Sequence, residues 1–138
     1  MEQQEALDSK EQQEVMDILY GYFMRETKDE DMSQEMLQKL GGMVQQEGVK
    51  LVHLGNTVYL TLVRGKGLIE FHPYYENRNV KSLVTDLKRY IPYLKALGVQ
   101  TAYTYQRPND FYARVIKESK IPFKSEVIDG QATYYTVM

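Results

Sequence analysis

Residues 68–97 read LIEFHPYYENRNVKSLVTDLKRYIPYLKAL. Within the first five, Leu68–His72, apolar and polar residues alternate from Ile69 onward, as they do in strands. From Asn79 to Leu97 apolar residues recur every three or four positions, which predicts an amphipathic helix. Pro92 lies inside this helix and predicts a kink or a broken turn. A strand that leads into a long helix is therefore the central unit of the sequence.

The next apolar segment, Val99–Tyr105, predicts the strand to which this helix returns the chain. A strand, helix and strand in succession form a crossover connection, and the two strands of such a unit run parallel. We therefore expect Leu68–His72 and Val99–Tyr105 to be parallel strands of one sheet.

Strands on both sides of this unit are expected to form hairpins. Two upstream strands are joined by Gly55-Asn56 and two downstream strands by Asp129-Gly130, dipeptides that favour tight turns. A helix from Asn109 to about Ser119 precedes the downstream pair. The four predicted strands are Val49–Leu54, Thr57–Val63, Phe123–Ile128 and Gln131–Val137.

Two helices are predicted before the first strand. One begins at Ser9, and the second is capped by Ser33. The expected order of elements is therefore ααβββαβαββ, an α/β (α+β) fold with a mixed, mostly antiparallel sheet flanked by helices. The Gln- and Glu-rich residues 1–8 are expected to be disordered or frayed, and residues 9–138 to form a single domain.

The composition excludes several classes of site. The chain of 138 residues has no cysteine, which excludes disulfides, thiolate metal sites and a cysteine nucleophile. It has two histidines, His53 and His72, too few for a three-histidine zinc site. No apolar run approaches the ~20 residues that a membrane span requires. We expect a soluble, cytoplasmic protein without a metal or a membrane contact.

Charge is distributed unevenly along the chain. Residues 1–50 contain 12 Asp or Glu and 5 Lys or Arg, whereas residues 51–138 contain 7 and 12. A basic part can attract phosphates, coenzymes or nucleic acid, although the two parts could instead neutralise each other. The tyrosines among these basic residues could form a stacking surface for single-stranded nucleic acid, but tyrosines more often line the rim of a core. Nucleic acid is therefore the least favoured partner.

From Val49 onward the predicted order of elements resembles that of the acetyl-coenzyme-A-dependent GNAT superfamily of N-acetyltransferases. Its members have a strand that ends near a proline, then a phosphate-binding loop and a long helix. Here Pro73 and Glu76-Asn77-Arg78-Asn79-Val80-Lys81 occupy those places, and Ile121-Pro122-Phe123 stands where the superfamily has Gly-Phe after a later helix. The resemblance implies the GNAT fold for residues 49–138.

The resemblance also implies a coenzyme A site at the start of the long helix. In the superfamily, backbone N–H groups there hold the pyrophosphate, and small residues let it approach. Glu76 and Asn79 replace an Arg/Gln and a glycine of that loop, which is therefore degenerate, although Asn79 is expected to tolerate a left-handed backbone. The implied coenzyme-binding residues are Arg78, Asn79, Val80, Lys81 and Ser82.

Glu70 and His72 are the candidate catalytic residues. They alternate along one predicted strand and therefore share a face of the sheet. The resemblance implies a base on this strand, which takes a proton from the amine, and a tyrosine in the later helix, which protonates the thiolate. Ile116 or Glu118 occupies the place of that tyrosine, and Tyr112 lies too early on the helix, so the acid role is expected to be vacant.

Two interpretations of function remain open. The sequence favours a catalytically degenerate GNAT-like protein that binds a protein partner, because the loop lacks glycines, the later helix lacks the tyrosine acid, and the N-terminal helices are polar and rich in methionine. Its shortened, acidic front resembles bacteriophage GNAT-like proteins, including an internal virion protein of short-tailed phages. This implies a phage particle or a second copy as partner, in the host cytoplasm or the virion. The alternative is an acetyl-CoA-dependent N-acyltransferase that acts on an amine.

Overall fold

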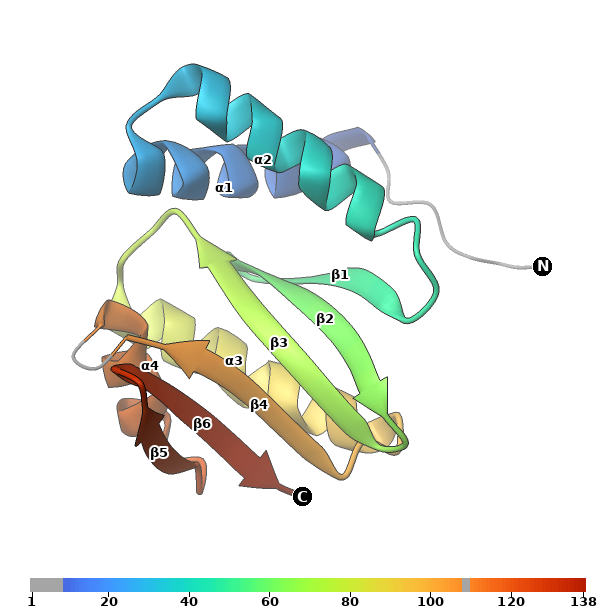
Figure 1. Cartoon of the computed structure of the whole chain (residues 1–138), viewed down its shortest axis with the longest axis vertical. Coiled ribbons are helices and arrows are strands. Elements are labelled where there is room, and N and C mark those ends of the chain that lie inside the picture. The colour runs from blue at the N-terminus through green and yellow to red at the C-terminus, as the bar shows by residue number, and fades with distance from the viewer. Residues whose placement is uncertain (1–8, 108–109) are drawn as a thin grey trace.

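The computed structural model describes residues 9–107 and 110–138, so the prediction for residues 1–8 lies outside the described part. Its elements follow the predicted order ααβββαβαββ (Figure 1). The helices are α1 (Ser9–Thr27), α2 (Glu30–Met43), α3 (Val80–Ala96) and α4 (Phe111–Ser119). The strands are β1 (Val49–Leu54), β2 (Thr57–Gly65), β3 (Leu68–Tyr75), β4 (Thr101–Gln106), β5 (Lys124–Ile128) and β6 (Gln131–Val137).

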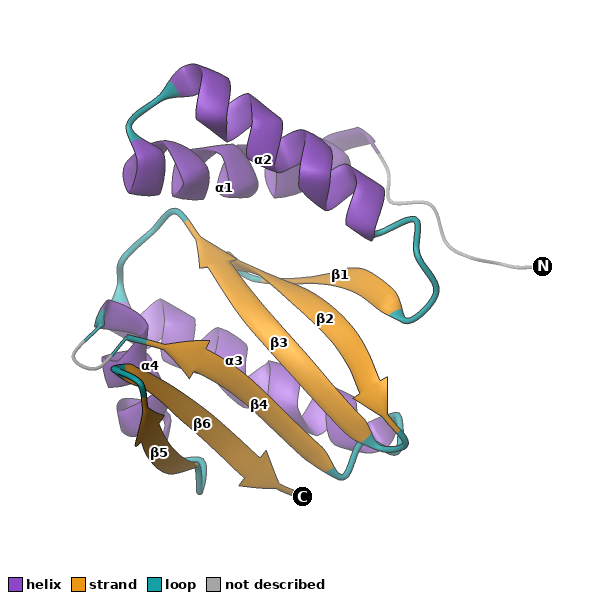
Figure 2. Ribbon diagram, viewed as in Figure 1, coloured by secondary structure: helices purple, strands orange, loops and turns teal. Residues whose placement is uncertain are grey.

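The strands form one six-stranded mixed sheet in the order β1-β2-β3-β4-β6-β5 (Figure 2). β3 and β4 run parallel, and the other neighbouring strands are antiparallel. The parallel pair confirms the crossover predicted from the sequence, with α3 as the connecting helix. The predicted fold class is likewise confirmed.

Helices cover the two faces of the sheet unequally. α3 and α4 pack on one face and enclose the larger core. α1 packs on the opposite face over β2 and β3, and α2 lies on α1 (Figure 1). Figure 1 shows no helix of the described chain in front of β4, β6 and β5 on the α1 side. Part of the sheet therefore stays accessible there.

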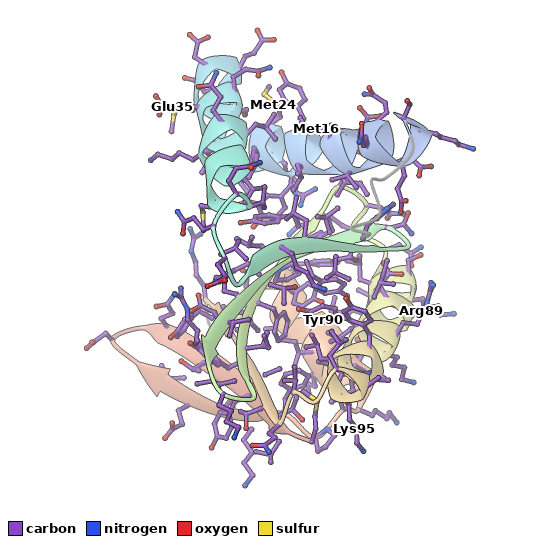
Figure 3. All side chains as sticks on the ribbon, turned by 90° about the vertical axis from the view of Figure 1, so that its right-hand side faces the viewer. Met16, Met24, Glu35, Arg89, Tyr90 and Lys95 are labelled. Atoms are coloured by element: carbon purple, nitrogen blue, oxygen red, sulfur yellow. The ribbon has the colours of Figure 1, made fainter. Side chains whose placement is uncertain are left out.

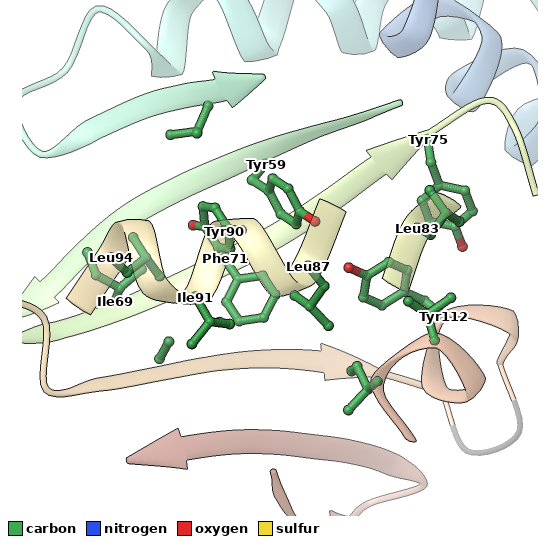
Figure 4. Close-up of a cluster of buried hydrophobic side chains, with 14 residues drawn as sticks. Tyr59, Ile69, Phe71, Tyr75, Leu83, Leu87, Tyr90, Ile91, Leu94 and Tyr112 are labelled. Carbon is green, nitrogen blue, oxygen red and sulfur yellow. The ribbon is translucent and has the colours of Figure 1, made fainter. Parts of the chain in front are cut away.

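Stacked rings fill the centre of the larger core (Figure 4). Tyr59 and Tyr90 lie parallel with ring centroids 3.9 Å apart, and Phe71 meets Tyr90 edge-on. The Tyr90 hydroxyl shares a hydrogen bond of 2.7 Å with Thr61 Oγ1. The polar end of the ring is thus satisfied inside the core.

The helical layers on the two faces carry opposite charge. Glu35 lies on α2, whereas Arg89 and Lys95 lie on α3 (Figure 3). The exposed charged residues of α3 are all basic, because its one acid, Asp86, is buried. The uneven charge of the sequence is therefore a separation in space as well.

The start of α2 differs from the prediction. Asp29 is the N-cap residue, and its side chain accepts a hydrogen bond of 3.0 Å from the Met32 amide. Ser33, the predicted cap, lies inside the helix, fully buried, 3.0 Å from Thr27 Oγ1. The acidic residues Asp29–Asp31, which follow the last apolar positions of α1, therefore form the start of α2.

Pro92 does not produce the broken turn that was one of the two predicted outcomes, because α3 runs uninterrupted from Val80 to Ala96. Pro92 is exposed. A proline on the solvent side removes one helical hydrogen bond, but water can satisfy the carbonyl group that loses it.

Asp86 joins α3 to the turn between β1 and β2. Its Oδ2 accepts hydrogen bonds from the Asn56 amide at 3.0 Å and from Thr57 Oγ1 at 2.8 Å. Gly55 has a φ of 57°, and a Cβ atom there would collide with the Asp86 carboxyl group. The turn therefore requires glycine both for its backbone and for the approach of Asp86.

We expect Asp86→Ala to lower the free energy of unfolding by about 2 kcal/mol, because the buried Thr57 hydroxyl and the partly buried Asn56 amide lose their acceptor. Asp86→Asn keeps one acceptor oxygen and should lose less. Urea unfolding at neutral pH measures both. Equal stability of all three proteins would contradict the proposed role of this contact.

The pH dependence of the free energy of unfolding gives a second test of the Asp86 contact. Burial raises the pKa of Asp86, although hydrogen bonds from Thr57 and Asn56 oppose the shift. The stabilisation linked to this shift is fully present below the unfolded-state pKa and is lost as the pH rises through the folded-state pKa. Wild type should therefore gain stability relative to Asp86→Asn as the pH falls.

Candidate active site

β3 and β4 separate after three paired positions, of which the last joins Glu70 and Tyr103. Beyond this pair, β3 runs on to Tyr75 and β4 to Gln106 without pairing with each other. A cleft of about 480 Å³ lies at this end of the sheet, a size typical of small-molecule sites. Its lining residues include Tyr22, Phe23, Glu26, Met36, His72, Tyr75, Tyr105 and Gln131.

Glu70 and His72 lie together on β3, as their alternation predicts. His72 Nε2 is 2.5 Å from Glu70 Oε2. The other carboxylate oxygen, Oε1, accepts hydrogen bonds from Arg64 Nε at 2.8 Å and from the Tyr103 hydroxyl at 3.2 Å. Glu70 is only 8% exposed, whereas His72 lines the cleft. The pair therefore reaches from the sheet surface to the cleft.

These contacts keep Glu70 ionised and Tyr103 protonated. Burial opposes ionisation of Glu70, but hydrogen bonds from Arg64 and His72 outweigh it and lower the pKa of Glu70. Burial and the charge of Glu70 raise the pKa of Tyr103 to about 12. A carboxylate beside Nε2 favours the His72 tautomer that carries its proton there. The basic lone pair of His72 then lies on Nδ1.

Asn79 caps α3, and its side chain hydrogen-bonds to one of the amides predicted to bind a coenzyme, that of Ser82. The φ and ψ of Asn79 are −86° and 111°, an extended conformation, so the tolerance of Asn for a left-handed backbone is not needed here. Asn79 Oδ1 accepts a hydrogen bond of 3.1 Å from the Ser82 amide. Among the described residues, the amides of Val80 and Lys81 have no partner. Two of the predicted backbone donors are therefore available to an anion.

Arg78 and Lys81 place positive charge at the same helix end. The Arg78 guanidinium carbon lies 4.6 Å from the ring centroid of Phe111, the first residue of α4. Lys81 is exposed. Neither residue forms an ion pair with a described residue. Both charges can therefore act on an anion at the start of α3.

α1 holds the segment that follows β3. Arg25 donates hydrogen bonds to the carbonyl groups of Tyr75, at 2.7 Å, and Glu76, at 2.8 Å. Its guanidinium carbon lies 5.4 Å and 5.1 Å from the ring centroids of Tyr22 and Tyr75. A Cβ atom at Gly21 would lie 2.6 Å from the Glu76 side chain. The Glu76 carboxyl group therefore packs against α1.

Tyr112 is not available to the cleft. It is completely buried, and its ring lies in the larger core (Figure 4). Tyr75 stacks on it with ring centroids 5.5 Å apart and does line the cleft. Burial raises the pKa of Tyr75 to about 12, so its hydroxyl remains protonated at neutral pH.

Sequence reasoning missed four residues of this site. Arg64 and Tyr103 reach Glu70 from two different strands, and Gly21 and Arg25 reach the segment after β3 from α1. A signal existed only for Tyr103, since it alternates with its neighbours on a strand predicted to lie beside β3. The described residues contain no cluster of three or more metal-ligating side chains. No described helix has the length and apolar character needed to cross a membrane.

No model of a known protein family matches this sequence, and no curated protein matches it. Solved structures do. The chain resembles the PaiA N-acetyltransferase of Thermoplasma acidophilum in complex with coenzyme A, with 10% identity, a TM-score of 0.63 and 97% of each chain covered. It resembles the N-acetyltransferase PseH of Campylobacter jejuni in complex with acetyl coenzyme A, with 16% identity, a TM-score of 0.64 and coverage of 96% of this chain and 93% of that chain.

A GNAT-family acetyltransferase of Staphylococcus aureus is similar too, with 13% identity, a TM-score of 0.61 and 95% of each chain covered. At these identities the likeness shows the fold alone. The fold predicted from the sequence, that of the GNAT superfamily, is thereby confirmed. The narrower resemblance to a phage virion protein stays a prediction.

We expect Arg25→Met to loosen the segment after β3, because two carbonyl groups lose their donor. The backbone amides of Asn79, Ser82 and Leu83, which donate to Asn77 and Asn79 of this segment, should exchange with deuterium faster, while the centre of the sheet keeps its protection. Gly21→Ala should act on the same segment by displacing the Glu76 side chain. Arg114→Met is the control, since Arg114 contacts Glu118 on the exposed side of α4. Unchanged exchange at these three amides in both variants would contradict the role of α1.

Proposed function

We propose that this protein transfers an acyl group from a coenzyme A thioester to an amine. The observation that carries the proposal is the Glu70–His72 pair, which lies where β3 and β4 separate and reaches the cleft. The fold shared with PaiA and PseH, whose structures contain coenzyme A and acetyl coenzyme A, supports it. The non-catalytic alternative does not account for a buried carboxylate that orients a histidine at a cleft.

The residues at the start of α3 fit a pyrophosphate. The free amides of Val80 and Lys81, the positive end of the helix dipole and the charges of Arg78 and Lys81 all favour an anion there. Acetyl coenzyme A would supply the activated acyl group. Asn79 limits the site, because its side chain already holds the Ser82 amide.

His72 acts as the general base in this proposal. Its Nδ1 accepts the proton that the amine loses as nitrogen bonds to the acyl carbon. Glu70, held in place by Arg64 and Tyr103, accepts from Nε2 and stabilises the positive charge that His72 then carries. Tyr75 lines the cleft, and its hydroxyl, which stays protonated at neutral pH, is the candidate proton donor to the departing thiolate.

The lining of the cleft favours a cationic acceptor. Glu26 contributes a negative charge, and the ring of Tyr105, which is 38% exposed, offers an aromatic face. Cations bind to such faces. An amine is cationic until the base deprotonates it, so these groups and His72 would act in succession on one substrate.

The non-catalytic interpretation predicted a protein partner, a second copy or a virion among them. It rested on the missing glycines of the loop, on the missing tyrosine of the later helix and on the polar, methionine-rich N-terminal helices. Asn79 caps the helix without glycine and leaves two amides free, and a different tyrosine, Tyr75, lines the cleft. The first two grounds are therefore weaker in the structure than in the sequence, whereas Met16, Met32 and Met36 of the N-terminal helices are exposed. Absence of both coenzyme binding and acyl transfer would restore it.

His72→Ala is expected to lower kcat/KM for acyl transfer by roughly 10²- to 10⁴-fold, the usual contribution of a general base. Release of free thiol from acetyl coenzyme A, measured with a panel of mono- and diamines, reports the rate. His53→Gln is the matched control, because His53 lies on β1 in contact with Glu11 and the Gly55 carbonyl group. Equal rates for the two variants would refute the role of His72.

Asn79→Gly should bind coenzyme A more tightly, by roughly tenfold, because it frees the Ser82 amide to donate a hydrogen bond to a phosphate oxygen. The loss of an Asn cap to glycine costs only a few tenths of a kcal/mol, so the helix should persist. Asn79→Asp is the matched comparison, since it keeps the cap, adds a negative charge and should weaken binding. Titration calorimetry that gives one affinity for all three proteins would rule out this site.

A further inference from the structure

A second cavity, of about 370 Å³, lies at the other end of β3 from the cleft. It is enclosed by the last turn of α3, the turn after it and the ends of β1, β2 and β3. Most of its side chains are apolar, including those of Val49, Val63, Ile69, Leu94 and Leu97. This volume falls within the range of sites that bind small molecules.

Glycines leave this corner of the molecule unfilled. Gly48, Gly67 and Gly98 line the cavity with φ values of 81°, 71° and 92°. Residues that have a side chain rarely adopt this left-handed backbone conformation, so the turns at these three positions require glycine. At these three positions no side chain extends into the space between α3 and the sheet. The cavity is therefore a result of how the turns are built.

Lys50 is the only charged residue among the described residues that line the cavity. It lies on β1 opposite Thr61, on the face of the sheet that α3 covers. Its Nζ donates a hydrogen bond of 2.8 Å to the Tyr93 hydroxyl on α3. An ammonium group has three donors, so two remain. One cation with spare donors therefore stands at the edge of an apolar space.

The rim of the cavity carries large apolar side chains in contact with water. Val63 is 57% exposed and Leu97 is 59% exposed. A ligand with an apolar body would remove both from water, and such burial is favourable in proportion to the area covered. Polar groups of the wall are already engaged, since Thr61 Oγ1 pairs with the Tyr90 hydroxyl.

We propose that this cavity binds a small amphiphilic carboxylate, whose apolar body fills the space and whose carboxylate pairs with Lys50. The site is independent of the acyl-transfer cleft, because the two share no lining residue. The negative charge is the decisive part of the ligand. A neutral molecule of the same shape would fill the cavity but leave the donors of Lys50 unused.

Octanoate and 1-octanol test this proposal on the whole chain. Chemical shifts of backbone amides in a titration give both the affinity and the place of binding. Octanoate should bind at least several-fold more tightly than octanol, with shifts centred on Val63, Gly67 and Gly98. Equal affinity for the two, no binding, or shifts centred on His72 and Tyr105 would overturn the proposal.

Variants separate the contribution of charge from that of shape. Lys50→Gln should weaken octanoate about fivefold, the upper range for an exposed ion pair, and leave octanol unchanged. Lys95→Gln, which removes a lysine of α3 outside the cavity, should change neither. Tyr93→Phe releases Lys50 from its hydroxyl partner and should keep or strengthen octanoate binding. Val63→Trp should obstruct the cavity and weaken both ligands. If Lys50→Gln and Lys95→Gln behave alike, the assignment to Lys50 is wrong.

Discussion

The parallel pairing of β3 with β4, limited to three positions, is the constraint on which the rest of the structure depends. Hydrogen bonds hold the strands together at one end, and their separation beyond Glu70 and Tyr103 creates the cleft. The crossover helix α3 starts from the open end of β3 and returns to the paired end of β4, so its N-terminus lies on the side of the cleft. A longer ladder would close the cleft and separate the helix end from any ligand within it.

α1 completes this arrangement from the opposite face. It contributes Tyr22, Phe23 and Glu26 to the wall of the cleft, and its Arg25 fixes the backbone where β3 ends. One helix thus contacts both the space for an acceptor and the segment that leads to the start of α3. The two helices predicted before the first strand, α1 and α2, both contribute to this wall. The wall is therefore built from side chains of α1 and α2.

Patterns along the chain predicted the elements, their order and the parallel pair, because spacing and turn residues are local properties. Alternation also placed Glu70 and His72 on one face of β3. Arg64 could not be predicted as a partner of Glu70, since it lies where the register of β2 becomes irregular, between Val63 and Gly65. The cap of α2 was predicted wrongly because several polar residues compete to cap that helix. No turn is broken at Pro92 because this residue lies on the exposed side of α3, where water can satisfy the carbonyl group that loses its hydrogen bond.

The opposite charges of the two helical layers give this molecule an electric dipole that its formal net charge of −2 conceals. An approaching anion would be turned toward the basic side over a range of about 8–10 Å at physiological salt. The same asymmetry governs adsorption, which follows local rather than total charge. Near its isoelectric point the protein would be retained both by a cation-exchange resin, through its basic helical layer, and by an anion-exchange resin, through its acidic helical layer.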